Sequence, residues 1–195
     1  MKKLYATFLI IACTLVSLPC NAQAEWKNDF SKQGETLKTV GRGNCAVTDG
    51  VFRSVDAYSC FGNLEWKNYT MSFKARAPKD ADQVQIWAGF RAYNRFDRYV
   101  LGLKGGLQDD IYLMRLGTDE FLGVRPLGFH PVPGEWYNIK VEVCGSRIRV
   151  FLNNEKEPRI DVTDKNGNLA PSGQVTLGGG WIETEFDDLV VTPMK

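Results

Sequence analysis

The residues whose types and spacing best suit chemistry form a stripe in the middle of the chain. Apolar and polar residues alternate over 83–92, which predicts a β-strand with one buried and one open face. The candidate ligand-binding residues on the open face and in the following loop are Gln85, Trp87, Arg91, Tyr93 and Arg95. An indole can stack on the C–H face of a sugar ring while guanidinium and amide groups hydrogen-bond its hydroxyls. The stripe therefore predicts a carbohydrate site. The alternative is that Trp87 packs under a loop and the arginines only solvate the sheet.

Nearby residues bear on the same prediction. Gly89, between Trp87 and Arg91, is expected to leave room for a ligand to approach the backbone. The run Gly178-Gly179-Gly180 is expected to bend the sheet or to place Trp181 at its rim. Three basic residues would favour acidic sugars if they cluster beside the stripe, namely Lys74, Arg76 and Lys104.

A second candidate is the acidic triplet Glu183, Glu185 and Asp187, in which every second residue is a carboxylic acid. On a strand these three side chains share one face. Two carboxylates that face one cleft can act as nucleophile and general acid/base in glycoside hydrolysis. The alternative is that these acids cap loops or hold a structural cation.

The cofactor that the sequence suggests is a structural calcium ion. Asp29, near the first predicted strand, could meet Asp187 or Asp188 in the last, because terminal strands often pair in sandwiches. Carboxylate oxygens suit Ca²⁺. With a single histidine, His130, and no CxxC motif, a zinc site is not expected.

Three cysteines lie beyond the N-terminal segment. Cys45 and Cys60 could close a short disulfide loop in an oxidising compartment. Cys144 is the odd one, either a buried thiol at a strand end or a side chain on the outer sheet face. The odd number leaves the pairing open.

The elements that must position these residues are short strands at even spacing, separated by turn residues, with no long helix. The clearer strands are expected at 69–77, 83–92, 98–104, 110–116, 136–144, 147–152, 174–177 and 185–192, and weaker ones at 26–30, 37–41, 51–54 and 159–162. Such spacing is typical of a sandwich or barrel. We predict an all-β fold, a two-sheet antiparallel jelly-roll sandwich.

The order of these pieces resembles a known superfamily. The paired central strands of laminin-G-like modules are similar to Ala88-Gly89-Phe90-Arg91 followed by 98–103. Their next hairpin is similar to 136–143 with 147–153, and their last strand is similar to 186–191. The resemblance covers roughly 26–192 and indicates the concanavalin A-like lectin/glucanase superfamily. Within it, the chain resembles the 3-keto-disaccharide hydrolase-type family and non-catalytic modules of bacterial polysaccharide-degrading enzymes. The superfamily includes lectins, hydrolases and structural modules, so the resemblance implies the fold more than the activity.

The same resemblance bears on the acidic triplet. Laminarinase-type glycosidases of that superfamily carry a similar triplet, whose outer glutamates serve as nucleophile and acid/base. Here the last member is Asp187, and the segment is the final predicted strand rather than one in mid-chain. Both departures weaken the likeness.

The N-terminus has the pattern of a signal peptide. Lys2 and Lys3 precede an apolar run, and Ala22-Gln23-Ala24 fits a cleavage site, so 1–24 are expected to be removed and 25–195 to form a single jelly-roll domain. Acylation at Cys20 is the lipoprotein alternative. Without its two N-terminal lysines the chain keeps 22 of its 24 basic residues against 23 acidic ones. This balance predicts no nucleic-acid partner. The apolar run is too short and too near the N-terminus for a membrane span, and no transmembrane segment is expected in the mature chain.

These observations favour an exported carbohydrate-binding module, periplasmic, cell-surface or extracellular, that serves bacterial glycan or polysaccharide utilisation with a glycan or oligosaccharide as partner. The first alternative is a glycoside hydrolase on the same fold. The second is a structural or adhesion domain.

Overall fold

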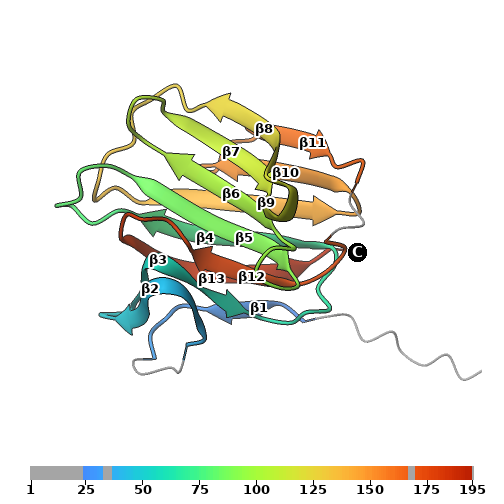
Figure 1. Ribbon diagram of the computed structural model, residues 1–195, viewed down its shortest axis with the longest axis horizontal. Helices are drawn as coiled ribbons and strands as arrows, with labels where there is room; N and C mark the ends of the chain where they lie inside the picture. The colour runs from blue at the N-terminus through green and yellow to red at the C-terminus, as the bar shows by residue number, and fades with distance from the viewer. Residues whose placement is uncertain (1–23, 33–36, 167–169, 195) are drawn as a thin grey trace, which may run out of the picture.

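Alternating apolar side chains build two antiparallel sheet layers that bury these side chains between them. The computed structural model describes residues 24–32, 37–166 and 170–194 (Figure 1). The strands are β1 (Trp26–Asn28), β2 (Thr39–Thr48), β3 (Val51–Phe61), β4 (Tyr69–Arg76), β5 (Gln85–Ala92), β6 (Tyr99–Lys104), β7 (Asp110–Arg115), β8 (Glu120–Pro126), β9 (Tyr137–Cys144), β10 (Arg147–Leu152), β11 (Ile160–Thr163), β12 (Gln174–Gly178) and β13 (Thr184–Pro193). The other regular element of the described residues is the short 3₁₀ turn η1 (Leu116–Thr118).

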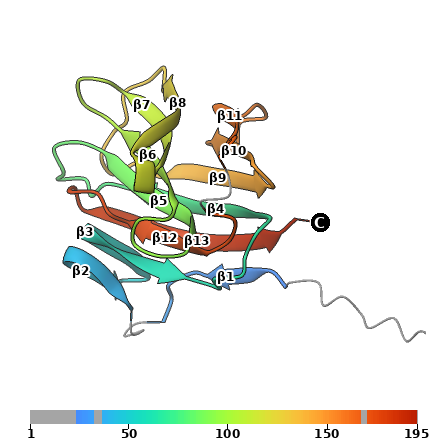
Figure 2. The ribbon, with the colours of Figure 1, turned by 45° about the vertical axis from the view of Figure 1, so that its right-hand side comes forward.

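The strands pair in the order β11-β10-β9-β4-β13-β3-β12-β5-β6-β7-β8, with β1 added to β13 and β2 to β3. One layer contains β11, β10, β9, β4 and β13, and the other contains β12, β5, β6, β7 and β8 (Figures 1 and 2). At the far edge β8 lies against β11, where a Cβ added to Gly123 would be 3.0 Å from Ile160 Cγ2. The sandwich is therefore nearly closed, and the predicted all-β antiparallel jelly roll is confirmed.

Strand β3 joins the two layers. Its first part, through Phe52–Ser54, pairs with β13, and its last part, from Tyr58 to Phe61, pairs with β12. Between these parts Asp56 has φ of +45°, and its backbone N–H donates to Gly180 O at 2.7 Å. A left-handed residue bends the strand at this point. The long β3 is thus shared between the layers, and it supplies Phe52 and Phe61 to one core.

The core contains the side chains that the strand alternation predicts. In β4 the buried set is Met71, Phe73 and Ala75, and in β5 it begins with Ile86 and Ala88. Phe90 and Tyr99 stack across β5 and β6 with their ring centroids 5.2 Å apart. Because these residues face inward, their strand neighbours form the open face on which ligands can bind.

Most strands lie within one or two residues of the prediction. The weak prediction at 51–54 extends to Phe61, the one at 37–41 becomes the longer β2, and β8 was missed. The sequence of β8, Glu-Phe-Leu-Gly-Val-Arg-Pro, contains a glycine and ends in proline, and most of its side chains are exposed. An edge strand of this kind carries little periodic signal.

Candidate functional site

A row of residues across four strands forms the floor of a hollow on the outer face of the β5–β8 layer. In the pairing register Trp87 lies opposite Gly102, Gly102 opposite Tyr112, and Tyr112 opposite Val124. Because Gly102 has no side chain, the Tyr112 ring lies over it, and a Cβ there would be only 2.1 Å from Tyr112 Cζ. The Tyr112 ring meets the Trp87 ring edge to face, with 6.5 Å between centroids.

Two further aromatic side chains wall this hollow, which we call the aromatic cavity. Trp181 contacts Trp87 at 5.9 Å between ring centroids, and Phe121 contacts Tyr112 at 5.5 Å. Trp181 and Phe121 are 65% and 59% exposed, so both rings are open to solvent. The cavity has a volume of about 350 Å³. Its lining residues are Gln85, Trp87, Lys104, Gln108, Asp110, Tyr112, Phe121, Val124 and Trp181.

Local backbone chemistry places Trp181 at the rim. Gly178 and Gly179 have φ of +99° and +115°, conformations that L side chains rarely adopt. Gln85 Oε1 then accepts hydrogen bonds from the backbone N–H of Trp181 at 2.7 Å and of Ile182 at 3.3 Å. The glycine run was expected to bend the sheet or seat this tryptophan, and the structure confirms the expectation. Gln85 lines the cavity, but its carbonyl oxygen holds the loop.

The polar groups of the cavity are only partly satisfied. Lys104 Nζ lies 3.8 Å from Asp110 Oδ2, and burial, together with the nearby Asp110 carboxylate, raises the pKa of the Tyr112 hydroxyl above its ordinary value. Among the described residues, Asp110 Oδ1 and Trp87 Nε1 are buried without a hydrogen-bond partner. Unpartnered buried polar atoms cost free energy, which a bound polar group can recover.

Of the five predicted ligand-binding residues, Gln85 and Trp87 line the aromatic cavity. Tyr93 is 65% exposed in the loop between β5 and β6, outside the cavity. Arg95 is exposed in the same loop and lines a separate hollow. Of the three basic residues expected to flank the stripe, Lys104 does so, while Lys74 and Arg76 belong to the other layer.

The predicted position of Arg91 beside Trp87 is wrong. Two residues of β5, Phe90 and Arg91, lie opposite one residue of β12, and Arg91 has φ of +48°. This β-bulge reverses the alternation. The Arg91 side chain is 3% exposed, and its Nε and Nη2 donate to Lys67 O at 3.0 and 2.7 Å. The space above Gly89 is not free for a ligand either, because a Cβ there would lie 2.4 Å from Thr176 Oγ1.

Two of the three acids of the triplet, Glu185 and Asp187, are held in ion pairs on the other layer, and Glu183 lies in the segment before β13. Glu185 is 4% exposed, and its carboxylate lies 2.7 Å from Arg76 Nε and 3.0 Å from Arg53 Nη2. Asp187 Oδ2 lies 3.1 Å from Lys74 Nζ. Two of the three carboxylates are thus neutralised by cations of β3 and β4, an arrangement that stabilises the sheet and offers no free acid/base pair.

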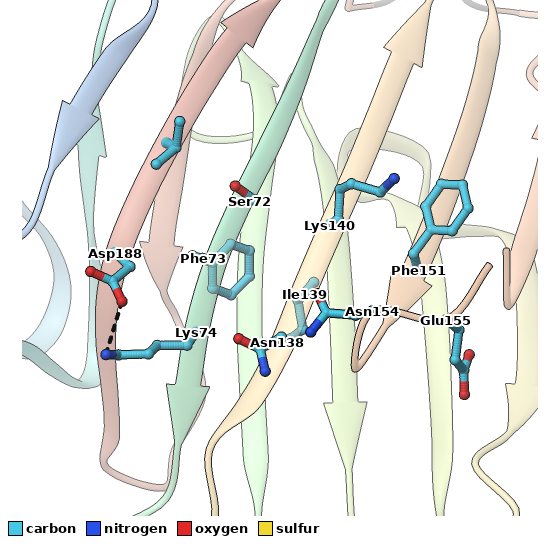
Figure 3. A pocket seen from close by; sticks show the side chains of 11 residues that line it. Ser72, Phe73, Lys74, Asn138, Ile139, Lys140, Phe151, Asn154, Glu155 and Asp188 are labelled. Carbon is cyan, nitrogen blue, oxygen red and sulfur yellow. Dashed lines mark ion pairs between the residues drawn. The ribbon is translucent and has the colours of Figure 1, made fainter. Parts of the chain in front are cut away.

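A second hollow, of about 510 Å³, lies over this layer (Figure 3). Its charged groups are already engaged: Lys74 Nζ is 2.9 Å from Asp188 Oδ2, and Lys140 Nζ lies over the Phe151 ring at 3.9 Å from its centroid. Phe151 itself is buried. This hollow therefore offers neither an exposed aromatic face nor an uncompensated charge.

The predicted calcium residues do not form a ligand set. Strands β1 and β13 do pair, as expected, with Asn28 opposite Leu189. Asp188 and Asp187 nevertheless pair with Lys74, and Asp29 accepts a hydrogen bond from Ser31 N at 3.1 Å. In the part of the chain that the structure describes, no three His, Cys, Asp or Glu side chains come together in a way that could hold a metal ion.

The three cysteines of the described chain are free thiols, so the Cys45–Cys60 bond is not formed in this structure. The register places Cys45 opposite Ser54 and Cys60 opposite Thr176, on different strand pairs. Cys144 is exposed on the outer sheet face, one of the two positions expected for it. The predicted signal peptide, apart from its last residue Ala24, and Cys20 lie outside the described residues. The described part of the chain contains no helix that is long and apolar enough to cross a membrane.

Sequence reasoning did not identify Tyr112 and Phe121 as site residues. The segment that contains Tyr112 is apolar on both faces, which hid its orientation, and Phe121 lies in the strand that was missed. The available signal was Gly102, which lies between two aromatic residues in adjacent strands and leaves room for one ring to cover it.

No protein-family model matches the chain, and no curated protein matches it. Solved structures do. A Bacillus subtilis protein of unknown function with a galectin-like fold is 11% identical, with 88% of this chain and 97% of that chain covered and a TM-score of 0.63. The carbohydrate-binding module CBM66 from Bacillus subtilis is 14% identical, with 82% of this chain and 94% of that chain covered and a TM-score of 0.57. A structure reported with endo-acting O-glycanases of the human gut microbiota is 11% identical, with 87% of this chain and 99% of that chain covered and a TM-score of 0.58.

The fold is the jelly roll of concanavalin A-like lectins and glucanases. At such low identity the likeness concerns the fold alone. The narrower resemblance to laminin-G-like and 3-keto-disaccharide hydrolase-type proteins stays a prediction.

Proposed function

We propose that this chain is a carbohydrate-binding module that holds a glycan in the aromatic cavity without chemical conversion. The observation that carries the proposal is the exposed ring of Trp181 at the rim of a cavity walled by three other aromatic rings. An exposed apolar surface of this kind on a soluble fold usually marks a binding site. Stacked aromatic rings suit the C–H faces of sugars.

The polar groups around the rings support a sugar rather than a purely apolar ligand. Lys104, Gln108 and Asp110 lie at the cavity, and they can donate to or accept from hydroxyl groups. The unpartnered Asp110 Oδ1 and Trp87 Nε1 are an acceptor and a donor, the two kinds of group that a hydroxyl satisfies. A few placed polar groups among aromatic walls are typical of small-ligand sites.

The content of the cavity favours binding over hydrolysis. Glycoside hydrolysis ordinarily uses two carboxylates that flank the scissile bond. Among the described residues that line the cavity, Asp110 is the only carboxylic acid. Glu185 and Asp187 of the triplet are ion-paired on the other layer. We therefore place the glycoside hydrolase and the structural or adhesion domain behind the binding module.

One of the structures with a similar fold is a carbohydrate-binding module, which supports the proposal that this chain binds carbohydrate. The same proposal includes export by the predicted signal peptide, which would bring the cavity to the glycans outside the bacterial cytoplasm.

A glycan array probed with the protein from residue 25 onward tests the proposal, followed by calorimetry on the best ligand. Trp181→Ala is expected to weaken binding at least about tenfold, because exposed aromatic anchors dominate such sites. Tyr93→Ala is a matched control, since Tyr93 is also 65% exposed but lies outside the cavity. Equal affinities for Trp181→Ala and wild type, or a larger loss in Tyr93→Ala, would overturn the proposed site.

A further inference from the structure

A third hollow adjoins the aromatic cavity on the same face of the sheet. It has a volume of about 400 Å³ and is lined by residues of β2, β3, the loop between β5 and β6, and η1. Gly179 lines it, and a Cβ there would lie 3.5 Å from Trp87 Cε3. Leu116 also lines it and packs against the apolar cluster that includes Trp87. Trp87 therefore lies between the two hollows.

Arg98 is one of the residues that line this third hollow. The Arg98 side chain runs across β5 above Gly89, where a Cβ would lie 3.5 Å from Arg98 Cδ, and its Cζ is 3.8 Å from the centroid of the Tyr58 ring. Gly89 is two residues from Trp87, roughly 7 Å along the strand. Arg98 therefore lies on the same face of β5 as Trp87.

Arg98 is buried and incompletely satisfied. It is 6% exposed, and its Nε and Nη1 have no hydrogen-bond partner among the described residues. Burial lowers the pKa of Arg98, and this outweighs the opposing effect of the neighbouring Tyr58. A buried charge without a hydrogen-bonded counter-charge is costly, and an anion in the hollow would relieve that cost.

The other charges at the hollow leave a positive surplus. Arg42 and Asp56, which both line it, form an ion pair at 3.5 Å. Among the remaining described lining residues, Arg95 and Arg98 face the single acid Asp119. The Arg95 guanidinium lies over the Phe96 ring at 5.5 Å from its centroid. Arginines stacked on aromatic rings are suited to recognise carboxylate and sulfate groups.

We propose that this hollow binds the anionic substituent of an acidic sugar through Arg98, so that the glycan recognised is an acidic oligosaccharide with one residue stacked in the aromatic cavity. This inference rests on the proposed function only for the sugar residue that stacks in the aromatic cavity. The anionic group is a carboxylate or a sulfate on a sugar ring. A uronic acid would supply the carboxylate, and a sulfated sugar would supply the sulfate.

Calorimetry on matched ligands tests the inference without any variant. The best uronic-acid oligosaccharide is compared with its carboxyl-reduced form, and the best sulfated oligosaccharide with its desulfated form. The wild-type protein is expected to bind the anionic member of at least one pair about tenfold or more tightly. The pair that shows the difference identifies the source. Equal affinity within both pairs overturns the inference, whereas binding of the neutral forms still supports the proposed function.

Two variants then locate the effect. Arg98→Met is expected to abolish the preference for the anionic ligand while it retains the affinity for the neutral form. Arg147→Ala removes one positive charge from an exposed ion pair on the other layer and is expected to change neither affinity. A preference that survives in Arg98→Met, or is lost equally in Arg147→Ala, refutes the role of Arg98. A preference that depends on Arg98 but not on Trp181 would support the anion site and reject the aromatic one.

Discussion

The substitution Gly102→Ala tests the central geometric claim, that the cavity floor depends on a missing side chain. The new Cβ would lie 2.1 Å from Tyr112 Cζ and 2.3 Å from Tyr112 Oη. Ordinary contact begins at 3.4 Å, so the ring must move by at least about 1.3 Å, the difference between 3.4 and 2.1. Overpacking of this kind costs about 1–3 kcal/mol. It outweighs the roughly 0.5–1 kcal/mol by which alanine is favoured over glycine inside a strand.

The same substitution is expected to weaken glycan binding about tenfold or more, because the displaced Tyr112 ring loses its edge-to-face contact with Trp87 and changes the cavity. Urea denaturation followed by circular dichroism measures the stability, and calorimetry measures the affinity. Both losses should occur in a protein that keeps its far-ultraviolet spectrum.

A second background makes the reasoning refutable. In a Tyr112→Ala protein the clash is absent, so Gly102→Ala should stabilise the fold by about 0.5–1 kcal/mol rather than destabilise it. Gly102 has no positive φ that alanine would resist. If Gly102→Ala destabilises both backgrounds equally, the ring does not depend on this glycine and the account of the floor is wrong.

Two further substitutions test ion pairs on which the fold depends. Asp164→Asn is expected to lower the free energy of unfolding by about 2 kcal/mol, because it removes the buried one of the two carboxylates that pair with Arg115 and leaves only the half-exposed Glu120; urea denaturation would show this. Burial raises the pKa of the Asp164 carboxyl, but hydrogen bonds from Arg115 and Tyr99 outweigh this effect and hold the pKa below its ordinary value. The stability that the Asp164 carboxylate contributes is therefore complete above its unfolded-state pKa and is lost as the pH falls through its folded-state pKa. An acid-side loss of stability as large in Asp164→Asn as in wild type would contradict this assignment. Glu185→Gln is expected to lower the free energy of unfolding by about 1–2 kcal/mol, because it removes the charge that pairs with Arg76. An unchanged melting temperature would show that this ion pair is dispensable.

Strand alternation was sufficient to predict most of the fold. The inward sets of β4, β5 and β9 are buried as expected, because a sheet packed on one face must place alternate side chains in the core. The prediction failed where both faces are apolar, as in β7, and where a strand lies at an edge, as in β8. At those places the sequence pattern carries no information about which side of the sheet a residue occupies.

The site was predictable to the extent that the alternation holds. Gln85 and Trp87 precede the bulge in β5 and lie at the aromatic cavity, as their positions in the strand imply. Trp181 could be expected at a rim because three consecutive glycines precede it. The contact that brings Trp181 to Trp87 joins residues 94 positions apart, which neither residue's local sequence reveals.

The β-bulge in β5 decides on which side of the sheet Arg91 lies. Period-two counting from Trp87 places Arg91 on the open face, but the bulge at Phe90 and Arg91 turns the Arg91 guanidinium toward Lys67 O. Arg98 occupies the space above Gly89 instead. Arg98, and not the predicted Arg91, is therefore the arginine on the same face of β5 as Trp87, with its guanidinium over the Tyr58 ring. Nothing in the residue types of 83–92 signals the bulge, at which Arg91 N donates a tertiary hydrogen bond to Tyr69 Oη at 2.9 Å. A sequence in which Arg91 kept the alternation would leave Lys67 O without this guanidinium donor and would place Arg91 on the same face of β5 as Trp87.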